Sequence, residues 1–260
     1  MSPAVIVTLI IVGIVVMVGA AFIAQSVENA RKERLRRIAI INDRIRHLSG
    51  TLNDIPNQYM TTDLRQFVIG LIRQSCAALF TLAPNHSGAT AQLKKLDELS
   101  TQAFANELDS LQPPFEDPVT GQNIRTRIKD LVNILVALNK DGSLEKSLAV
   151  KYVNQGKMLF ELISVDVSLL AARHSEKDEN TFKAALINYS SCLKKIQKIN
   201  TQSQFTHRIA HLQAKTEQLQ QKVKTQVEKA AALAAEKAVE EEKNTRADSN
   251  KDWQIKHDYE

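Results

Sequence analysis

The hydrophobic positions of this chain recur at intervals of three and four residues. One such stripe comprises Leu35, Ile38, Ile41, Ile45, Leu48 and Leu52. Because this spacing places side chains on one face of an α-helix, the stripe predicts an amphipathic helix, which Pro56 ends. No segment alternates apolar and polar residues between turn residues, so no sheet is expected. The pattern therefore predicts an all-α fold.

Residues 26–200 form the predicted helical domain, a bundle or a set of helical hairpins. Helical stripes are predicted over residues 35–52, 64–79, 93–111, 124–138, 143–172 and 182–196. The clearest break between them is QPPFEDPVTG, residues 112–121, which contains three prolines and a glycine.

An offset of 83 residues relates the first stripe to the fourth. It aligns Ile45, Leu48, Leu52 and Ile55 with Ile128, Leu131, Leu135 and Leu138, and Arg44 with Arg127. Either the two halves are a duplication, or two unrelated amphipathic helices share this spacing, and the sequence favours the second alternative.

Residues 201–243 change to a heptad pattern that predicts a coiled-coil-like helix. The seam comprises Phe205, Ile209, Leu212, Thr216, Leu219 and Val223, at spacings of four and three. The seam either pairs with a protein partner or packs back on the body, and the sequence favours pairing. Residues 244–260 are polar and predict a disordered tail.

The chain begins with an apolar run at residues 4–24, inside a predicted anchor segment of residues 1–25. These 21 residues carry no charge. At 1.5 Å per residue they span about 31 Å as a helix, which matches the roughly 30 Å of a bilayer core. A cleaved signal peptide is the alternative, but it needs a basic residue before the run and a small-x-small site after it. No basic residue precedes the run, so a retained transmembrane helix is expected.

A basic collar follows the apolar run. It comprises Arg31, Lys32, Arg34, Arg36, Arg37, Arg44 and Arg46. Since Lys and Arg are retained on the cytoplasmic side, we expect a single-pass membrane protein with its N-terminus outside and its body in the cytoplasm. The collar is then expected to lie against anionic lipid. This layout is similar to that of bacterial inner-membrane adaptors, so the bacterial inner membrane is the expected location.

The net charge of +5 comes mostly from this collar. Residues 28–46 hold seven basic and three acidic residues, and residues 47–260 hold 27 basic and 26 acidic ones. A nearly neutral body has no phosphate-binding footprint. Nucleic acid is therefore an unlikely partner, and binding to it through the collar is a minor alternative.

No catalytic, cofactor-binding or metal-binding motif is found in the sequence. The phosphate-binding, dinucleotide-binding, hydrolase and zinc-protease motifs are all missing. His207 and His211 lie four residues apart, but no Cys, Asp or Glu nearby completes a metal site. Cys76 and Cys192 are expected to be buried free thiols. No enzyme activity is therefore expected.

These observations predict a membrane-tethered helical scaffold or adaptor that binds protein partners at the cytoplasmic face. The alternatives are a structural homo-oligomer at the membrane and nucleic-acid binding through the collar. The bilayer and at least one protein are the expected partners.

Overall fold

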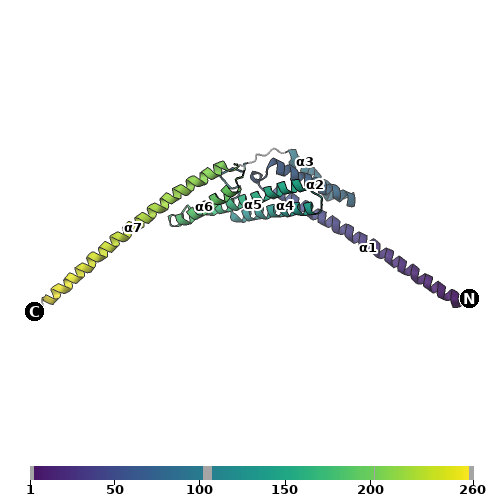
Figure 1. Ribbon diagram of the computed structural model, residues 1–260, viewed down its shortest axis with the longest axis horizontal. Helices are drawn as coiled ribbons and strands as arrows, with labels where there is room; N and C mark the ends of the chain where they lie inside the picture. The colour runs from purple at the N-terminus through teal and green to yellow at the C-terminus, as the bar shows by residue number, and fades with distance from the viewer. Residues whose placement is uncertain (1–2, 102–106, 202, 258–260) are drawn as a thin grey trace. The chain divides into compact units, whose positions relative to one another are not determined.

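The computed structural model describes residues 3–101, 107–201 and 203–257 (Figure 1). Side chains are described between residues 17 and 243 of these ranges, except at residue 242. Within this part of the chain the structure consists of helices and turns, without a strand. The predicted all-α class is confirmed.

The described residues form seven α-helices and two short 3-10 helices. The α-helices are α1 (Pro3–Asp54), α2 (Thr62–Leu82), α3 (Ser87–Thr101), α4 (Pro118–Lys140), α5 (Lys146–Ser175), α6 (Phe182–Ile199) and α7 (Thr206–His257). The 3-10 helices are η1 (Asn57–Tyr59) and η2 (Glu179–Thr181).

The two longest helices differ most from the predicted elements. Helix α1 joins the apolar run, the collar and the first stripe into one 52-residue helix, because no proline lies between Pro3, where it begins, and Pro56. Helix α7 continues through residues 244–257, which were predicted as a disordered tail. No Gly or Pro follows the strongly helix-forming residues 228–243, so nothing in the sequence ends that helix.

The chain divides into two compact units, whereas the sequence predicted one helical domain with a break near residues 112–121. Unit 1 comprises Met1–Glu107 and Ile124–Leu159, and unit 2 comprises Leu108–Asn123 and Phe160–Glu260. The predicted break at residues 112–121 lies inside unit 2.

The core of unit 1 forms where the last third of α1 packs against α2, which also packs against α3. Its buried side chains include Leu48, Ile55, Leu64, Ile72 and Leu79. They come from the predicted apolar stripes, so burial of one face per helix accounts for this packing.

Arginine side chains close the C-terminal ends of two helices in unit 1. Arg34 of α1 donates from Nε to the Leu82 carbonyl oxygen at 2.9 Å, at the end of α2. Arg65 donates from Nη2 to the Leu99 carbonyl oxygen at 3.1 Å, near the end of α3. The last carbonyls of a helix have no partner inside it and carry partial negative charge, so a guanidinium there stabilises the helix end.

Helices α1 and α4 exchange reciprocal ion pairs. Arg44 of α1 lies 3.7 Å from Asp141, just after α4, and Arg127 of α4 lies 2.8 Å from Asp54, at the end of α1. Each helix thus pairs one of its arginines with an aspartate at the C-terminal end of the other helix. Arg44 and Arg127 are the two arginines that the 83-residue offset aligns.

The same offset relates two residues that face each other. His47 aligns with Asp130, and the His47 Nδ1 atom lies 3.8 Å from an Asp130 carboxylate oxygen. A residue that meets its own counterpart is what an approximate twofold relation between α1 and α4 would produce. For these two helices, the duplication stays a hypothesis drawn from the sequence offset.

The core of unit 2 forms between α6 and the first part of α7. The carboxylate of Asp109 accepts hydrogen bonds from the backbone N–H groups of His207 and Arg208, at 2.9 and 3.0 Å. A residue about 100 positions away therefore caps the first turn of α7. An ion pair between Arg208 and Asp166, 2.8 Å apart, joins α7 to α5 inside this core.

Both cysteines are free and buried, as predicted. Cys76 lies in α2 and Cys192 in α6. Burial raises the pKa of both thiols, that of Cys192 to about 12. Neither side chain is therefore a reactive thiolate at neutral pH.

Candidate functional site

The first candidate surface is the exposed stretch of α1 from Met17 to Val27, where the apolar run ends. Its large apolar side chains are each 64–73% exposed; they are Met17, Val18, Phe22, Ile23 and Val27. At about 100° per residue, these five positions point in directions all around the helix. They therefore form no single apolar face of the kind that binds a partner helix, and an all-round apolar surface is typical of a helix in lipid or in a protein core.

Among the residues that the structure describes, none of the helices combines the length and apolarity needed to cross a membrane. The side chains of residues 4–16, most of the predicted span, lie outside the described residues.

The second candidate surface is the basic collar, whose seven residues have different surroundings. Three form ion pairs with acids on the same helix: Lys32 with Glu28, Arg37 with Glu33, and Arg46 with Asp43. Arg34 and Arg44 instead contact α2 and Asp141, as described above. Arg31 and Arg36 are exposed and make no ion pair with a described residue. The collar is thus partly a structural element of unit 1.

The third candidate surface is the heptad seam of α7. Phe205, Leu212 and Leu219 are buried, and Ile209 and Val223 are half-buried. Since α6 packs against this part of α7, the seam packs on its own chain in this structure. This is the alternative that the sequence did not favour. A protein partner at the seam stays a prediction, and the exposed part of α7 beyond Val223 is where its apolar side chains are accessible.

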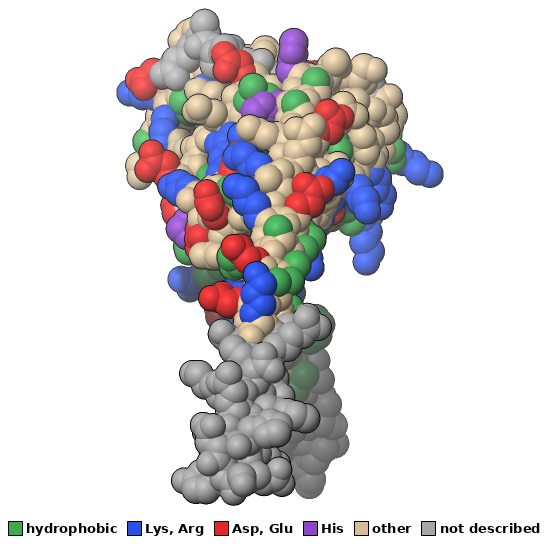
Figure 2. Space-filling model, turned by 90° about the vertical axis from the view of Figure 1, so that its left-hand side faces the viewer, with side chains coloured by type: hydrophobic (Ala, Val, Ile, Leu, Met, Phe, Trp, Pro, Cys, Tyr) green, Lys and Arg blue, Asp and Glu red, His purple; other side chains and the backbone are tan. Residues whose placement is uncertain are grey.

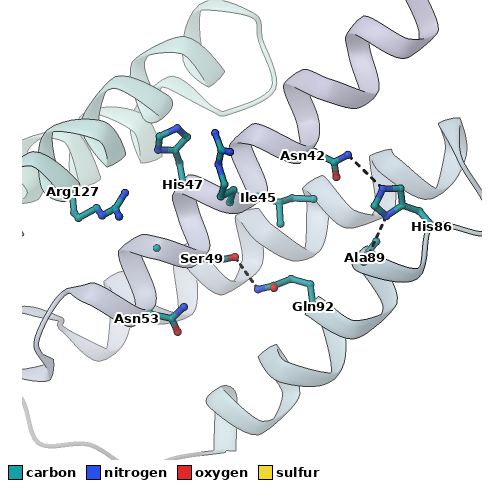
Figure 3. A pocket seen from close by; sticks show the side chains of 12 residues that line it. Asn42, Ile45, His47, Ser49, Asn53, His86, Ala89, Gln92 and Arg127 are labelled. Atoms are coloured by element: carbon teal, nitrogen blue, oxygen red, sulfur yellow. Dashed lines mark hydrogen bonds between the residues drawn. The ribbon is translucent and has the colours of Figure 1, made fainter.

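The fourth candidate surface is a polar groove of about 710 Å³ in unit 1, which we call the α1–α3 groove (Figure 3). Helix α1 supplies Asn42, Arg46, Ser49, Gly50 and Asn53 along one side. The opposite side comes from the start of α3, and α4 adds Arg127 next to Gly50. The polar residues of α1 recur at four, three and four, so they share one face of the helix.

Two hydrogen-bonded contacts link the walls of the groove. Gln92 of α3 donates from Nε2 to Ser49 Oγ at 2.8 Å. The His86 ring accepts at Nδ1 from the Ala89 N–H at 3.2 Å, and its Nε2 lies 3.4 Å from Asn42 Nδ2. His86 thus caps the N-terminus of α3 with a ring nitrogen and also fixes that end against α1.

The charged groups that line the groove are all basic. Arg46 and Arg127 line it, whereas no Asp or Glu does. Their partners Asp43 and Asp54 lie outside the lining, and Asp130 lies behind the His47 ring. The Arg127 guanidinium lies against Gly50 of α1: a Cβ at Gly50 would be in van der Waals contact with Arg127 Cζ, at 3.5 Å.

The polar side chains of the groove can hold a ligand through hydrogen bonds. The hydroxyl of Ser49 has an amide for its partner, not a base, so it is not activated as a nucleophile. No cluster of three His, Cys, Asp or Glu suited to a metal ion occurs among the described residues. The polar stripe of α1 was visible in the sequence, but such a stripe usually faces solvent, and only the position of α3 turns it into a groove.

Charge on the outer surface is mixed. Figure 2 shows one face of the molecule, on which basic and acidic side chains are interspersed. That distribution agrees with the near-neutral charge of residues 47–260 and offers no continuous track for a phosphate backbone on this face.

The chain matches no known protein family, no curated protein and no solved structure. The residues and their surroundings are therefore the basis for its function.

Proposed function

We propose that the chain is a membrane-tethered helical scaffold or adaptor that binds protein partners at the cytoplasmic face. The observation that carries this proposal is the all-round apolar exposure of α1 between Met17 and Val27, directly before the collar. Water does not favour such a surface, and burial in lipid removes it from water at a gain of about 25 cal/mol per Å². In the sequence, residues 4–16 before it are uncharged as well.

The continuous helix α1 makes the tether rigid. Ala24 ends the apolar run, and Ile45 is the first buried residue of α1 in unit 1. The 21 residue steps from Ala24 to Ile45 correspond to about 31 Å of helix. The anchor would therefore hold unit 1 at a distance from the bilayer surface, in the position of an adaptor rather than of a lipid-bound enzyme.

Along the same helix, the collar residues lie at different distances from the predicted anchor. Arg31 lies about 10 Å beyond Ala24 along the helix, and Arg46 about 33 Å beyond it. Because surface charge acts over a Debye length of about 8–10 Å, only the first collar residues would contact anionic lipid. Arg44 and Arg46 would serve unit 1, where their partners are Asp141 and Asp43.

Carbonate extraction of membranes tests the tether. The full chain is expected to stay in the membrane pellet at alkaline pH, and a variant without residues 4–24 is expected to move to the supernatant with its helical circular dichroism signal retained. A reporter active only in the cytoplasm, fused to the C-terminus, tests the orientation. Release of the full chain, or activity only from a reporter on the outer side, would refute the proposal.

A structural homo-oligomer is the second candidate, and the exposed half of α7 favours it. Val227, Leu233 and Val239 are each more than half exposed beyond the part of α7 that packs on α6. Cross-linking of the protein in membranes tests this candidate, since a chain that stays monomeric at native density would rule it out.

A further inference from the structure

We propose that the α1–α3 groove binds an extended, acidic peptide segment of a protein partner. This inference rests on the proposed adaptor function and names the class of partner that the body of the adaptor takes.

The length of the groove fits a short extended segment. Asn42 and Asn53 mark the ends of the polar stripe on α1, and 11 residues of helix correspond to about 16 Å. A peptide in the β conformation rises about 3.3 Å per residue, so roughly five residues would lie along the groove. The volume of about 710 Å³ is within the range of ligand sites in proteins.

The lining is suited to an extended backbone rather than to a helix. An extended segment presents free N–H and C=O groups, and side-chain amides offer both donors and acceptors to match them. Asn53 offers a whole amide, and Gln92 offers its Oε1 because its Nε2 is bonded to Ser49. A bound helix satisfies its own backbone and needs apolar contacts, but the lining has only Ile45 and Ala89 as apolar side chains.

The two arginines select for carboxylate side chains. The ion pair of Arg46 uses Nη2, and that of Arg127 uses Nε, so each guanidinium keeps other N–H groups for a ligand. A guanidinium binds a carboxylate through two parallel hydrogen bonds, and no acidic residue in the lining opposes such a ligand.

The carboxylates outside the lining limit the long-range attraction. Asp43 and Asp54 form ion pairs with Arg46 and Arg127, and Asp130 lies beside His47. Their negative charges offset the positive charge that an approaching ligand would experience from outside the groove. Recognition would therefore depend on short hydrogen bonds more than on electrostatic steering, and affinity should fall only modestly with salt.

The position of the groove argues for a peptide rather than a lipid headgroup. Asn42 lies 18 residues beyond Ala24, which is about 27 Å along α1. A headgroup at the membrane surface would not reach this site on a rigid, upright α1, whereas a segment of a neighbouring protein would.

The first test fills the groove with a side chain and measures peptide binding to the full chain in detergent micelles. The probe is a fluorescein-labelled peptide of alternating glutamate and serine, about eight residues long, and fluorescence polarisation measures its binding. Gly50→Leu places a side chain in the groove, and Gly70→Leu is the matched control, since a Cβ at Gly70 of α2 meets no atom within 4 Å. We expect Gly50→Leu to weaken binding about tenfold, the effect of losing one good charged contact, and Gly70→Leu to leave it unchanged.

The second test compares two variants that each lose one arginine charge. Arg46→Gln and Arg37→Gln each remove one positive charge and leave an acid one turn earlier on α1, Asp43 or Glu33. Only Arg46 lines the groove, so only Arg46→Gln should weaken binding, again about tenfold. A peptide of alternating lysine and serine should not bind.

Four results would overturn this inference: no saturable binding of the acidic peptide to the native chain, equal binding by the Gly50→Leu variant, equal effects of the two arginine variants, or equal binding of the lysine peptide. These measurements do not depend on a bilayer. Release of the full chain by carbonate would refute the tether and leave the peptide result standing. Retention in the membrane pellet without peptide binding would refute only the proposed occupant of the groove.

Discussion

Loss of one partner from the buried ion pair of unit 2 should destabilise the protein severely. Asp166 is 0% exposed and the Arg208 side chain 4% exposed, with 2.8 Å between the Asp166 carboxylate and Arg208 Nη1. Arg208 Nε and Nη2 are also buried and have no hydrogen-bond partner among the described residues. The carboxylate of Asp166 is thus the main compensation for a guanidinium that water hardly reaches. The perturbation is Asp166→Leu, which removes the carboxylate and puts a larger, apolar side chain in its place.

The expected cost is about 3–5 kcal/mol, the range for removing one member of a buried pair and leaving the other charge without compensation. This is a large part of the 5–15 kcal/mol that typically stabilises a domain. The double variant Asp166→Leu with Arg208→Met should recover most of the loss, to within about 1 kcal/mol of the native chain, because a well-packed apolar pair replaces a buried ion pair at little cost.

Guanidinium chloride unfolding, followed by circular dichroism on the full chain in a non-ionic detergent, measures both differences. The comparison of the single and double variants separates an uncompensated charge from a general disturbance of packing. A cost below about 1 kcal/mol for Asp166→Leu would refute the reasoning, because it falls well under the range for an uncompensated buried charge. A double variant as unstable as the single one would refute it too.

Three further predictions use unfolding of the same protein. Gly70→Ala should stabilise by about 0.5–1 kcal/mol, since a Cβ there meets no atom within 4 Å, whereas Gly156→Ala should destabilise because its Cβ would lie 2.6 Å from Val132 Cγ2. Equal effects of the two alanines would contradict the close approach of α4 and α5. His86→Ala should lower the free energy of unfolding by about 1 kcal/mol, because it removes the cap of α3. His86→Asn should lower it less, because an amide oxygen can replace the ring nitrogen. A larger decrease for the Asn variant than for the Ala variant would exclude the cap. Burial, with the cations Lys215 and Arg173 beside it, lowers the pKa of His211. The unfolded chain therefore takes up this proton first, and stability should fall as the pH drops through about 6.5 towards the folded pKa. His211→Gln should flatten that slope, and an unchanged slope would show that His211 does not cause it.

The helices themselves follow from local sequence. Stripes such as Leu48 with Leu52, or Ile128 with Leu131, specify a helix and its buried face because burial of that face is the main driving force. The free, buried state of the two cysteines was equally predictable from their apolar surroundings. The position of Pro56 also placed the end of α1, whereas α4 begins at Pro118, inside the predicted break.

The parts that the sequence did not predict depend on partners far away in the chain. The heptad at Phe205 looks the same whether α6 or another protein covers it, so periodicity alone could not choose between them. The charge of Arg44 was evident, but its partner Asp141 is about 100 residues distant. The α1–α3 groove likewise needs α3 opposite Ser49, which no local pattern specifies.

A spin-label scan along α1 in lipid vesicles tests the central claim most directly, by comparing accessibility to oxygen, which partitions into lipid, with accessibility to a water-soluble nickel complex. Single cysteines at Met17, Val18, Phe22 and Ile23 carry the labels, because the buried Cys76 and Cys192 should not react, and further labels at Arg31 and Arg36 report on the collar. If α1 is embedded in the bilayer, all four apolar sites are open to oxygen and closed to nickel, with no helical periodicity, and the collar sites are open to nickel. Accessibility that rises and falls every three to four residues, or nickel access at every site, would contradict the membrane tether.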